Sequence, residues 1–562
     1  MFGLTMPNVP NIIRRYLVGS FLVAMVQFTR SELCTRILEG QHLIIYNRNV
    51  LRIPPSWLDA HPGGSLALLH FVGRDATSEI DAYHNDQILP MVNRYSIGTL
   101  SEPGPWNPLL PPIAAGWARK DGKWSSEAAT WNADSNQVFL VANNSPVLQK
   151  SAPTIETLTP LPSNISLEVQ EQHSVAYKML HKRVIDAGLY NTPYLTGYGP
   201  EFVRYISLGL ISTYAFQHNW LLTSALALGL MWHQLMFFVH DLGHLGVTGN
   251  WNIDRIISII VADFIGGLSI GWWSDNHNVH HLVTNHPSHD PDIEHLPFFA
   301  ISPKFFSNLY SSYYKRVMPF DSASQFFIRL QHYLFYVVMA FARFNLYRLS
   351  YASMYSKLFE KRRARGGRWA VGLEFIGVAF FWWWFGGIVL RGCGSWQKAL
   401  AYVFVSHAAT SPLHVQIVLS HFGMSTDDLG PVESFPDRQL RTTMDVKCPE
   451  KWGFIHGGLH LQVAHHLFPR LPRHNLNKAS LMVKEFAKEE NLTYVECGFV
   501  SANREVIGVL REVAGLVSSL GQQVKLVAEV ASTEAKEAVN KKIAQQEAAF
   551  TRSRSGISPS NI

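Results

Sequence analysis

The chain has 562 residues, of which 47% are hydrophobic and only 16% charged, and its formal net charge is +6. Because a typical soluble domain is about a quarter charged, this composition excludes a purely soluble protein and favours a membrane protein with soluble parts. The length predicts more than one domain, and no CxxC pair or disulfide framework is present among the four cysteines, Cys34, Cys393, Cys448 and Cys497.

Residues 1–30 form a separate N-terminal leader. After Arg14-Arg15 the apolar stretch from Tyr16 to Phe28 is shorter than the ~20 residues that cross a bilayer, and it has the length of a signal-peptide core. Three interpretations stay open for this leader: an atypical targeting segment, an interfacial helix or a start-site artefact.

Residues 31–103 predict a compact module of short strands and helices that carries three motifs. They are His61-Pro-Gly-Gly64, Phe71-Val-Gly-Arg-Asp-Ala-Thr77 and Asp81-Ala-Tyr-His84. The Pro-Gly-Gly turn lets backbone approach a flat macrocycle where a Cβ would clash. Together the motifs resemble cytochrome b5.

That resemblance implies an α+β haem domain in which His61 and His84 are the two axial ligands of haem b. Two axial imidazoles leave no open position on the iron, so this haem is expected to carry electrons rather than bind oxygen. His70 is the rival for the second ligand, but its run Leu66–Phe71 suits a packed helix.

Residues 104–165 are rich in Pro, Ser, Asn and Ala and predict a linker. A polar helix is expected at about 166–187, the start of a membrane domain that extends over residues 166–490. Five apolar segments follow: Phe202–Phe216, Leu221–Val239, Phe326–Phe344, Val371–Leu390 and Ala399–Leu419.

Four of these segments predict transmembrane helices, arranged as two hairpins that end at His240 and His421. This count places the basic run that begins at Lys361 and ends at Arg368 on the same membrane face as both ends, as the positive-inside rule requires. Phe326–Phe344 contains polar residues and is expected to be interfacial or re-entrant, and Ile253–Ile270 is expected to lie at the surface. A nucleic-acid partner for the basic run is disfavoured because apolar segments flank it.

Three histidine clusters follow or adjoin these segments: His240-Asp-Leu-Gly-His244, His277-Asn-Val-His280-His281 and Gln462-Val-Ala-His465-His466. Their i, i+3 and i+4 spacing puts the side chains of each cluster on one helical face. Neutral imidazole is a common ligand for iron, zinc and copper. The clusters hold eight ligand-type side chains, seven histidines and Gln462. These exceed the four ligands that one zinc ion takes, so we expect two metal ions.

A single histidine is more often a core or surface residue than a ligand. Seven histidines in three clusters beside apolar segments favour coordination, because burying that many unpaired imidazoles would cost several kcal/mol. Asp241, and with it Asp275, is expected to orient a neighbouring imidazole.

Joined to a cytochrome b5 module, these clusters resemble the front-end membrane desaturases over about residues 35–485. Gln462 carries much of this resemblance, since many other membrane desaturases have histidine there. The resemblance also implies that His421, which ends the second hairpin, is a further metal ligand, with His414 and His407 as weaker alternatives. The stretches from His277 to Asn285 and from Gln462 to Arg470 resemble fungal Δ8-sphingolipid desaturases. Val463-Ala464 departs from the acyl-lipid subgroup, and His460 departs from the family's usual asparagine.

The resemblance implies a di-iron centre that uses O2 to remove two hydrogens from adjacent methylenes of a ceramide long-chain base, giving a trans double bond. It implies electrons from NADH through cytochrome b5 reductase and the fused haem, in an endoplasmic reticulum membrane with the catalytic parts facing the cytosol. Gln462 is expected to be either a weak iron ligand or a hydrogen-bond donor in catalysis.

Three alternative functions stay open: a front-end Δ5 or Δ6 acyl-lipid desaturase, a lipid hydroxylase, and an electron carrier with an inactive membrane domain. Residues 491–562 predict a helical C-terminal tail that ends in disorder and carries no chemistry.

Overall fold

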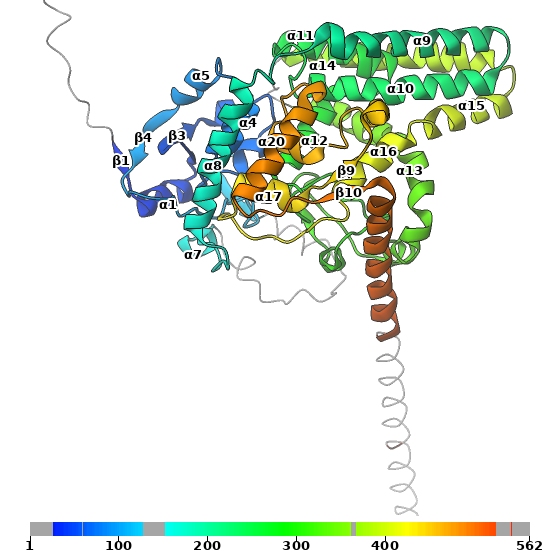
Figure 1. The fold of residues 1–562 in the computed structure, drawn as a ribbon. Helices are drawn as coiled ribbons and strands as arrows, with labels where there is room; N and C mark the ends of the chain where they lie inside the picture. Colours follow the sequence, from blue (N-terminus) through cyan, green and yellow to red (C-terminus); the bar gives the residue numbers. More distant parts are fainter. Residues whose placement is uncertain (1–25, 59, 127–151, 361–366, 524–540, 542–562) are drawn as a thin grey trace, which may run out of the picture. The chain divides into compact units, whose positions relative to one another are not determined.

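The computed structural model describes residues 26–58, 60–126, 152–360, 367–523 and 541. Most of the predicted leader, the middle of the predicted linker, most of the basic run and the end of the C-terminal tail lie outside the described residues. The chain divides into two compact units. Figure 1 labels many of their helices and strands. The N-terminal unit comprises described residues within 26–126, 152–178 and 429–435, and the membrane unit comprises those within 179–428 and 436–523.

The N-terminal unit contains a four-stranded sheet with the strand order β1-β4-β3-β2, in which only the β1–β4 pair is parallel. Its elements are β1 (Gln27–Phe28), α1 (Arg30–Leu38), β2 (His42–Tyr46), β3 (Asn49–Ile53), α2 (Pro55–Leu58), α3 (Leu66–Leu69), α4 (Thr77–Tyr83), α5 (Leu89–Asn93), β4 (Ser96–Leu100), β5 (Trp117–Lys120), β6 (Lys123–Ser126) and α7 (Ile155–Leu158). This is the small α+β architecture that the sequence predicts for the module.

Local chemistry explains where these elements begin and turn. Thr29 and Glu32 form a capping box that starts α1. Asn47 and Arg48 both have positive φ values, 46° and 64°, and they form the two-residue turn between β2 and β3. Such a turn matches the right-handed twist of an antiparallel pair.

Part of the predicted linker is folded onto this unit. Trp106, Leu109 and Leu158 are buried in the same hydrophobic cluster as strand residues such as Leu43 and Val50. The indole Nε1 of Trp106 donates to the carbonyl of Gly73 at 3.0 Å. The described ends of the segment 104–165 therefore differ from the linker expected there, because their apolar side chains are buried.

The membrane unit is helical, and α8 (Leu167–Asp186) leads into it. Its elements are η3 (Tyr194–Tyr198), α9 (Gly199–Gln217), α10 (Leu221–Gly243), α11 (Trp251–Ile259), η4 (Ile260–Ile265), α12 (Ile270–Leu282), η5 (Pro303–Ser307), β7 (Tyr310–Ser311), β8 (Arg316–Val317), α13 (Ser322–Lys357), α14 (Gly367–Phe381), η6 (Trp382–Leu390), α15 (Trp396–Ala408), α16 (Ser411–Leu419), α17 (Phe435–Thr442), β9 (Asp445–Lys447), η7 (Glu450–Trp452), α18 (Gly453–His456), α19 (Gln462–Leu467), η8 (Arg473–Asn475), α20 (Leu476–Glu489), β10 (Glu496–Gly498) and a helix over 499–523.

Helices form at all four predicted membrane spans. By length and composition, two helices of the described chain qualify as spans, α10 and the continuous pair α14–η6, and the bent pair α11–η4 and α12 gives a third if it is counted as one span. Two to three candidate spans therefore stand against the four predicted. Helix α9 carries the charged residues Glu201 and Arg204 in its first two turns. The last predicted segment is divided into two helices, α15 and α16, and Pro412 lies at the start of α16.

The bend between the pair α11–η4 and α12 is 113°. Side chains of neighbouring helices donate hydrogen bonds to backbone carbonyls at this bend. The carbonyls of residues 264, 265, 266 and 267 accept hydrogen bonds from Trp384, Trp232, Arg343 and Tyr351, respectively. Irregular backbone in a membrane region is stable only when such partners are present.

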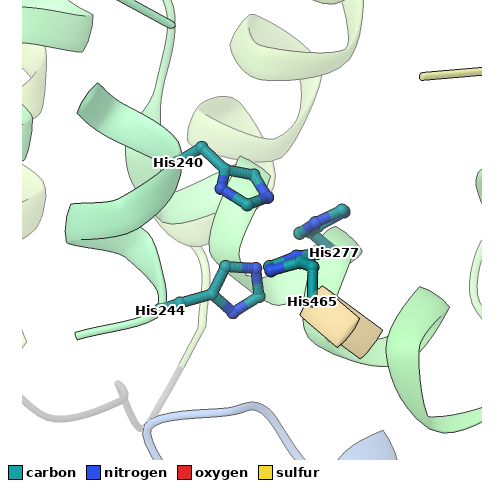
Figure 2. Close-up of side chains that lie close together, drawn as sticks. All are labelled: His240, His244, His277 and His465. Atoms are coloured by element: carbon teal, nitrogen blue, oxygen red, sulfur yellow. The ribbon is translucent and has the colours of Figure 1, made fainter. Parts of the chain in front are cut away.

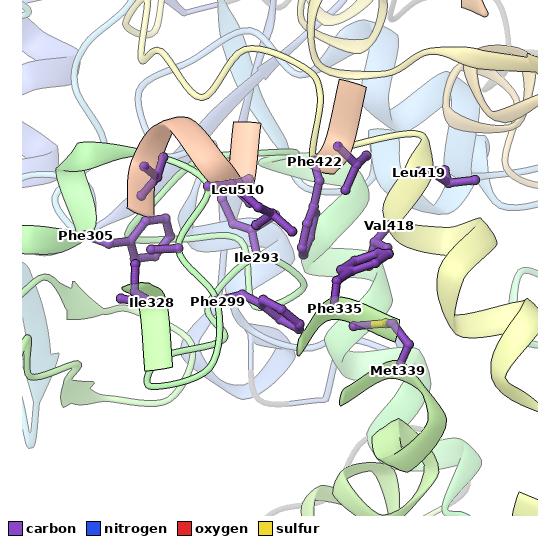
Figure 3. Close-up of a cluster of buried hydrophobic side chains, with 14 of the residues drawn as sticks. Ile293, Phe299, Phe305, Ile328, Phe335, Met339, Val418, Leu419, Phe422 and Leu510 are labelled. Atoms are coloured by element: carbon purple, nitrogen blue, oxygen red, sulfur yellow. The ribbon is translucent and has the colours of Figure 1, made fainter. Parts of the chain in front are cut away.

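The predicted interfacial segment Phe326–Phe344 lies within α13, a single helix of 36 residues with one buried stripe. Gln331, which interrupts the apolar pattern in the sequence, is fully buried and bonds to the backbone of Ala300 and Leu510. Figure 3 shows the surrounding hydrophobic cluster, in which Phe299, Phe335 and Phe422 pack together. The helix over 499–523 contributes Leu510 to this cluster, so the start of the predicted tail belongs to the core.

Candidate metal centre and haem site

Four histidines from three elements of the membrane unit form the first group, which we call histidine group A: His240, His244, His277 and His465. One ring nitrogen of each lies within 4.8 Å of one in every other member. Figure 2 shows the four imidazoles pointing toward one another, with His240 and His244 at the end of α10. Their ring centroids are 4.5 to 6.4 Å apart.

Three further histidines form histidine group B: His280, His421 and His466. Their ring centroids are 4.7 to 5.1 Å apart. His421 lies just after α16, where the sequence predicts an additional ligand. The two groups thus divide the linear clusters, since α12 and α19 each contribute to both.

His281 lies between the two groups. Its Nε2 is 3.1 Å from the Nε2 atoms of His277 and His465. A neutral imidazole nitrogen carries at most one proton, so His281 Nε2 cannot donate to both neighbours. Three ring nitrogens converging at this distance are compatible with coordination of one cation.

The imidazoles of group B share one orientation. Nδ1 donates outward from His280 to the Asp290 carboxylate at 2.9 Å, from His466 to Gln439 Oε1 at 2.9 Å, and from His421 to the Thr442 carbonyl at 3.2 Å. Each bond fixes the tautomer with its lone pair on Nε2. Carboxylate and carbonyl partners of this kind commonly orient metal-ligating histidines.

The unpaired nitrogens in both groups fit a metal centre. Among the described residues, no hydrogen-bond partner is present for the Nε2 atoms of His244, His421 and His466 or for either ring nitrogen of His240. Burial lowers the pKa values of His421, His465 and His466 well below the usual range of histidine. Neutral, buried imidazoles with free lone pairs are the form that binds transition metals.

Sequence reasoning missed the acidic and amide groups that orient these histidines. Asp290 is fully buried and accepts from His280, and Asp292 Oδ2 lies 3.4 Å from His277 Nδ1. Gln439 also binds the carbonyl of His281 through its Nε2. The sequence Asp290-Pro-Asp292, shortly after the second histidine cluster, is the local pattern from which these acidic partners could have been predicted.

The prediction that Asp241 and Asp275 orient neighbouring imidazoles is wrong. Asp241 Oδ2 accepts from Tyr198 at 2.5 Å and Arg473 at 2.7 Å, whereas its closest approach to His240 Nδ1 is 3.5 Å, without a hydrogen bond. Asp275 is paired with Lys357 at 2.9 Å. Stronger cationic and phenolic partners from other elements engage both carboxylates.

The remaining candidates lie as follows. Gln462 begins α19, is 2% exposed, and its Oε1 has no hydrogen-bond partner among the described residues. His407 stacks on Phe344 at 4.7 Å, and His414 Nε2 lies 3.5 Å from Thr410 Oγ1. Neither His407 nor His414 belongs to a histidine group.

In the N-terminal unit, the ring centroids of His61 and His84 are 6.2 Å apart. Nδ1 of His61 donates to the Gly64 carbonyl at 3.3 Å, and Nδ1 of His84 donates to the Ile80 carbonyl at 2.9 Å, which leaves Nε2 as the lone-pair atom of each ring. Gly64 has a φ of 82°, so the turn after His61 suits glycine. Burial lowers the pKa of His61 to about 4.

This arrangement fits haem iron held between two imidazoles, because metal–imidazole bonds of about 2.0–2.1 Å fill such a gap. His70, the rival ligand, is buried at the end of α3.

Two regions of the chain match known protein families. Residues 218–498 match the family described as fatty acid desaturase, and residues 29–101 match the cytochrome b5-like heme/steroid binding domain. A Delta 8-(E)-sphingolipid desaturase of Emericella nidulans is 41% identical over 534 residues, covering 88% of this chain and 97% of the relative. One of Kluyveromyces lactis is 40% identical over 91% of this chain and 96% of the relative.

A more distant relative, Delta(8)-fatty-acid desaturase 1 of Arabidopsis thaliana, is 34% identical over 60% of this chain and 74% of its own length. The fungal relatives thus align with both units, including the cytochrome b5-like region.

Proposed function

Because the chain belongs to the fatty acid desaturase family and carries a cytochrome b5-like domain, we propose that this oxidoreductase is a Δ8-(E)-sphingolipid desaturase. It would introduce a trans double bond between the eighth and ninth carbons of a ceramide long-chain base. The observation that carries this proposal is the identity of about 40% to desaturases of that name across nearly the full chain.

The metal ligands of this proposal are the members of histidine groups A and B with His281, and Gln462 is an additional ligand or hydrogen-bond donor. Two iron ions held there would supply the activation of dioxygen that removal of hydrogen from an unactivated methylene requires. The side chains themselves fix the site: Asp290, Gln439 and the Thr442 carbonyl hold the imidazoles of group B in one tautomer. Complete burial of His281 and His466 excludes bulk water from the reacting atoms.

In the N-terminal unit, His61 and His84 would hold haem b, which would supply electrons one at a time. NADH–cytochrome b5 reductase is the proposed donor. Fusion of the two units in one chain raises the effective concentration of donor and acceptor. The proposed location is the endoplasmic reticulum membrane with both cofactor sites toward the cytosol, where such a reductase is available.

The test is expression of the full chain in a yeast that makes no Δ8-unsaturated sphingoid bases, followed by mass spectrometry of sphingolipids and fatty acids. A Δ8-trans long-chain base is expected. New double bonds only in fatty acids would favour the acyl-lipid alternative, and a hydroxylated base without an alkene would favour a hydroxylase.

The matched control carries His465→Ala and His466→Ala together. This variant should give less than about 1% of the wild-type product, because each histidine group loses a ligand, while haem absorption stays unchanged. Product at the wild-type level from this variant would contradict the metal assignment.

A further inference from the structure

Among the buried polar side chains of the membrane unit that lie outside the histidine groups and have an unpaired atom, three come from segments that pack together. They are Nε2 of His233, Oε1 of Gln416 and Nδ1 of His460, none of which has a hydrogen-bond partner within the described ranges. These side chains are 4%, 2% and 6% exposed. Because a buried polar group without a partner destabilises a fold, each such group needs an explanation, and an absent ligand is one.

The three residues come from different elements that pack at one place. Gln416 Nε2 in α16 lies 3.5 Å from the carbonyl of Leu459, the residue before His460. In α10, Phe237 packs against Leu413 and Leu459 in one buried cluster. The ring of Phe237 is in turn 5.0 Å from that of His233.

The chain segment before His460 passes directly over α10. Gly457 has a φ of 55°, and a Cβ at this position would lie 2.1 Å from the Phe237 ring. Gln234 Nε2 in α10 also donates to the carbonyl of Phe454 at 3.0 Å. Helix α10, helix α16 and the segment 454–460, which carry the three unpaired atoms, therefore pack against one another around Phe237 and Leu459.

The hydrogen-bonding capacity of this region can be assigned. His233 Nδ1 lies 3.1 Å from Gln234 Nε2, an amide nitrogen that only donates, so His233 carries its proton on Nε2 and presents an N–H donor. Gln416 uses Nε2 toward Leu459 and therefore presents a carbonyl acceptor. The imidazole of His460 adds a third group that is able to donate or accept.

In the sequence of each element, the residue with the unpaired atom lies a few positions before a proposed metal ligand. His233 precedes His240 by two helical turns on the same face of α10, a rise of about 10 Å. Gln416 precedes His421, and His460 precedes Gln462 by two residues. A substrate whose reacting carbons lie at the histidine groups would therefore have another part of its chain within reach of this region.

We propose that His233, Gln416 and His460 form a polar subsite that binds the amide and hydroxyl groups of the ceramide substrate. This inference rests on the proposed function and deepens it. A ceramide presents a carbonyl acceptor to His233 and N–H and O–H donors to Gln416 and His460. A fatty acyl ester or thioester presents no donor, so Gln416 would stay unpaired, and a site built for hydrogen bonds rejects a ligand that lacks them.

The subsite also gives a physical basis for the position of the double bond. Hydrogen bonds at the polar end of the base hold its chain in one register, so that a fixed pair of methylenes faces the histidine groups. The helical rise from His233 to His240 is comparable with the length of the extended long-chain base from its amide and hydroxyl groups to its eighth carbon. These three residues are thus positioning residues, distinct from the metal ligands.

The experiment uses the full-length protein in lipid nanodiscs with NADH, a cytochrome b5 reductase, and either ceramide or a ceramide analogue that lacks the 3-hydroxyl group. The variants are His233→Leu, Gln416→Met and His460→Leu. Each should raise the KM for ceramide about two- to tenfold, the range for one lost hydrogen bond. Gln416→Met should also bring the KM values of ceramide and its deoxy analogue closer together than they are in the wild type.

Two further measurements separate positioning from a general structural effect. The variants should give products with double bonds at neighbouring positions, seen by ozonolysis and mass spectrometry, while iron content and haem absorption match the wild type. His233→Gln keeps an N–H donor and should restore most of the lost affinity. The control His407→Phe removes another buried imidazole, one that stacks on Phe344 and bonds to the Val403 carbonyl, and should leave KM and product position unchanged.

Unchanged KM and product position in Gln416→Met and His460→Leu, both with full iron content, would overturn the subsite. Loss of iron in all three variants would instead assign these residues to the metal centre and would equally overturn it. If the wild-type protein forms no Δ8 product from any ceramide, the proposed function itself fails, which is a separate result.

Discussion

At the scale of single residues, the two nitrogens of each imidazole have different roles. In histidine group B, Nδ1 is tied to Asp290, Gln439 or the Thr442 carbonyl, and Nε2 has no bond to another described side chain in His421 and His466. The outward bonds therefore orient the inward lone pairs. Loss of a charged outward partner should weaken metal binding more than folding.

We expect Asp290→Asn to lower iron affinity about 10- to 100-fold, the usual effect of removing such a partner of a metal-ligating histidine. The amide keeps the volume of the side chain but loses the charge that favours the Nδ1–H bond of His280. Titration of the purified metal-free protein with Fe(II) measures the change. The same substitution at Asp275, which pairs with Lys357, is the control and should leave affinity within about twofold; equal losses in both variants would argue against a specific role for Asp290.

At the scale of elements, a buried ionic network fixes the end of α10. Arg473 in η8 bonds to Glu201 of α9, to Asp241 of α10 and to the carbonyl of Phe237. Tyr198 adds a hydrogen bond to Asp241. Because Asp241 follows His240 directly, this network anchors the turn that carries His240 and His244.

Arg473→Met should destabilise the membrane unit by about 3–5 kcal/mol, since removing one partner leaves buried carboxylates without compensation. Thermal unfolding in detergent, compared with the wild type, measures this loss. Arg183→Met offers a matched control, because Arg183 lies 3.5 to 3.7 Å from Glu485 and Glu489 at the surface and should contribute less than about 1 kcal/mol. Similar melting shifts for the two variants would refute the special role of the buried network.

At the scale of the whole molecule, the two candidate cofactor sites are built independently. His61 and His84 belong to the N-terminal unit, and histidine groups A and B draw only on residues of the membrane unit. Each unit also has its own hydrophobic core. Loss of one cofactor should therefore leave the binding site of the other intact.

His61→Ala should abolish haem absorption and NADH-driven desaturation, while iron content and the melting temperature of the membrane unit stay within error of the wild type. Absorption spectroscopy, elemental analysis and product analysis of the same purified sample test this. Retained haem absorption would disprove the assignment of His61, and a parallel loss of iron would show that the two sites depend on each other.

Much of the site was predictable from sequence because its ligands recur at helical spacing. His240 lies on α10 with His244 at the C-cap of that helix, and the cluster from His277 to His281 lies on α12, close to what the helical spacing predicts. The turn at Gly63-Gly64 and the position of His84 at the end of α4 likewise follow from local sequence. Local spacing constrains a helical face or a turn, and these features depend on nothing more distant.

The tertiary structure alone decided which imidazoles share a group, which carboxylates orient them and how long the membrane helices are. His277 and His280 are neighbours on α12 yet belong to different groups, because each is completed by residues from α10, α19 or the end of α16. Asp241, which is expected to orient an imidazole, instead accepts from Tyr198 and Arg473. Asp290, for which the sequence predicts no role, accepts from His280. Partner choice across distant segments is set by the assembled fold, and no local pattern in the chain encodes it.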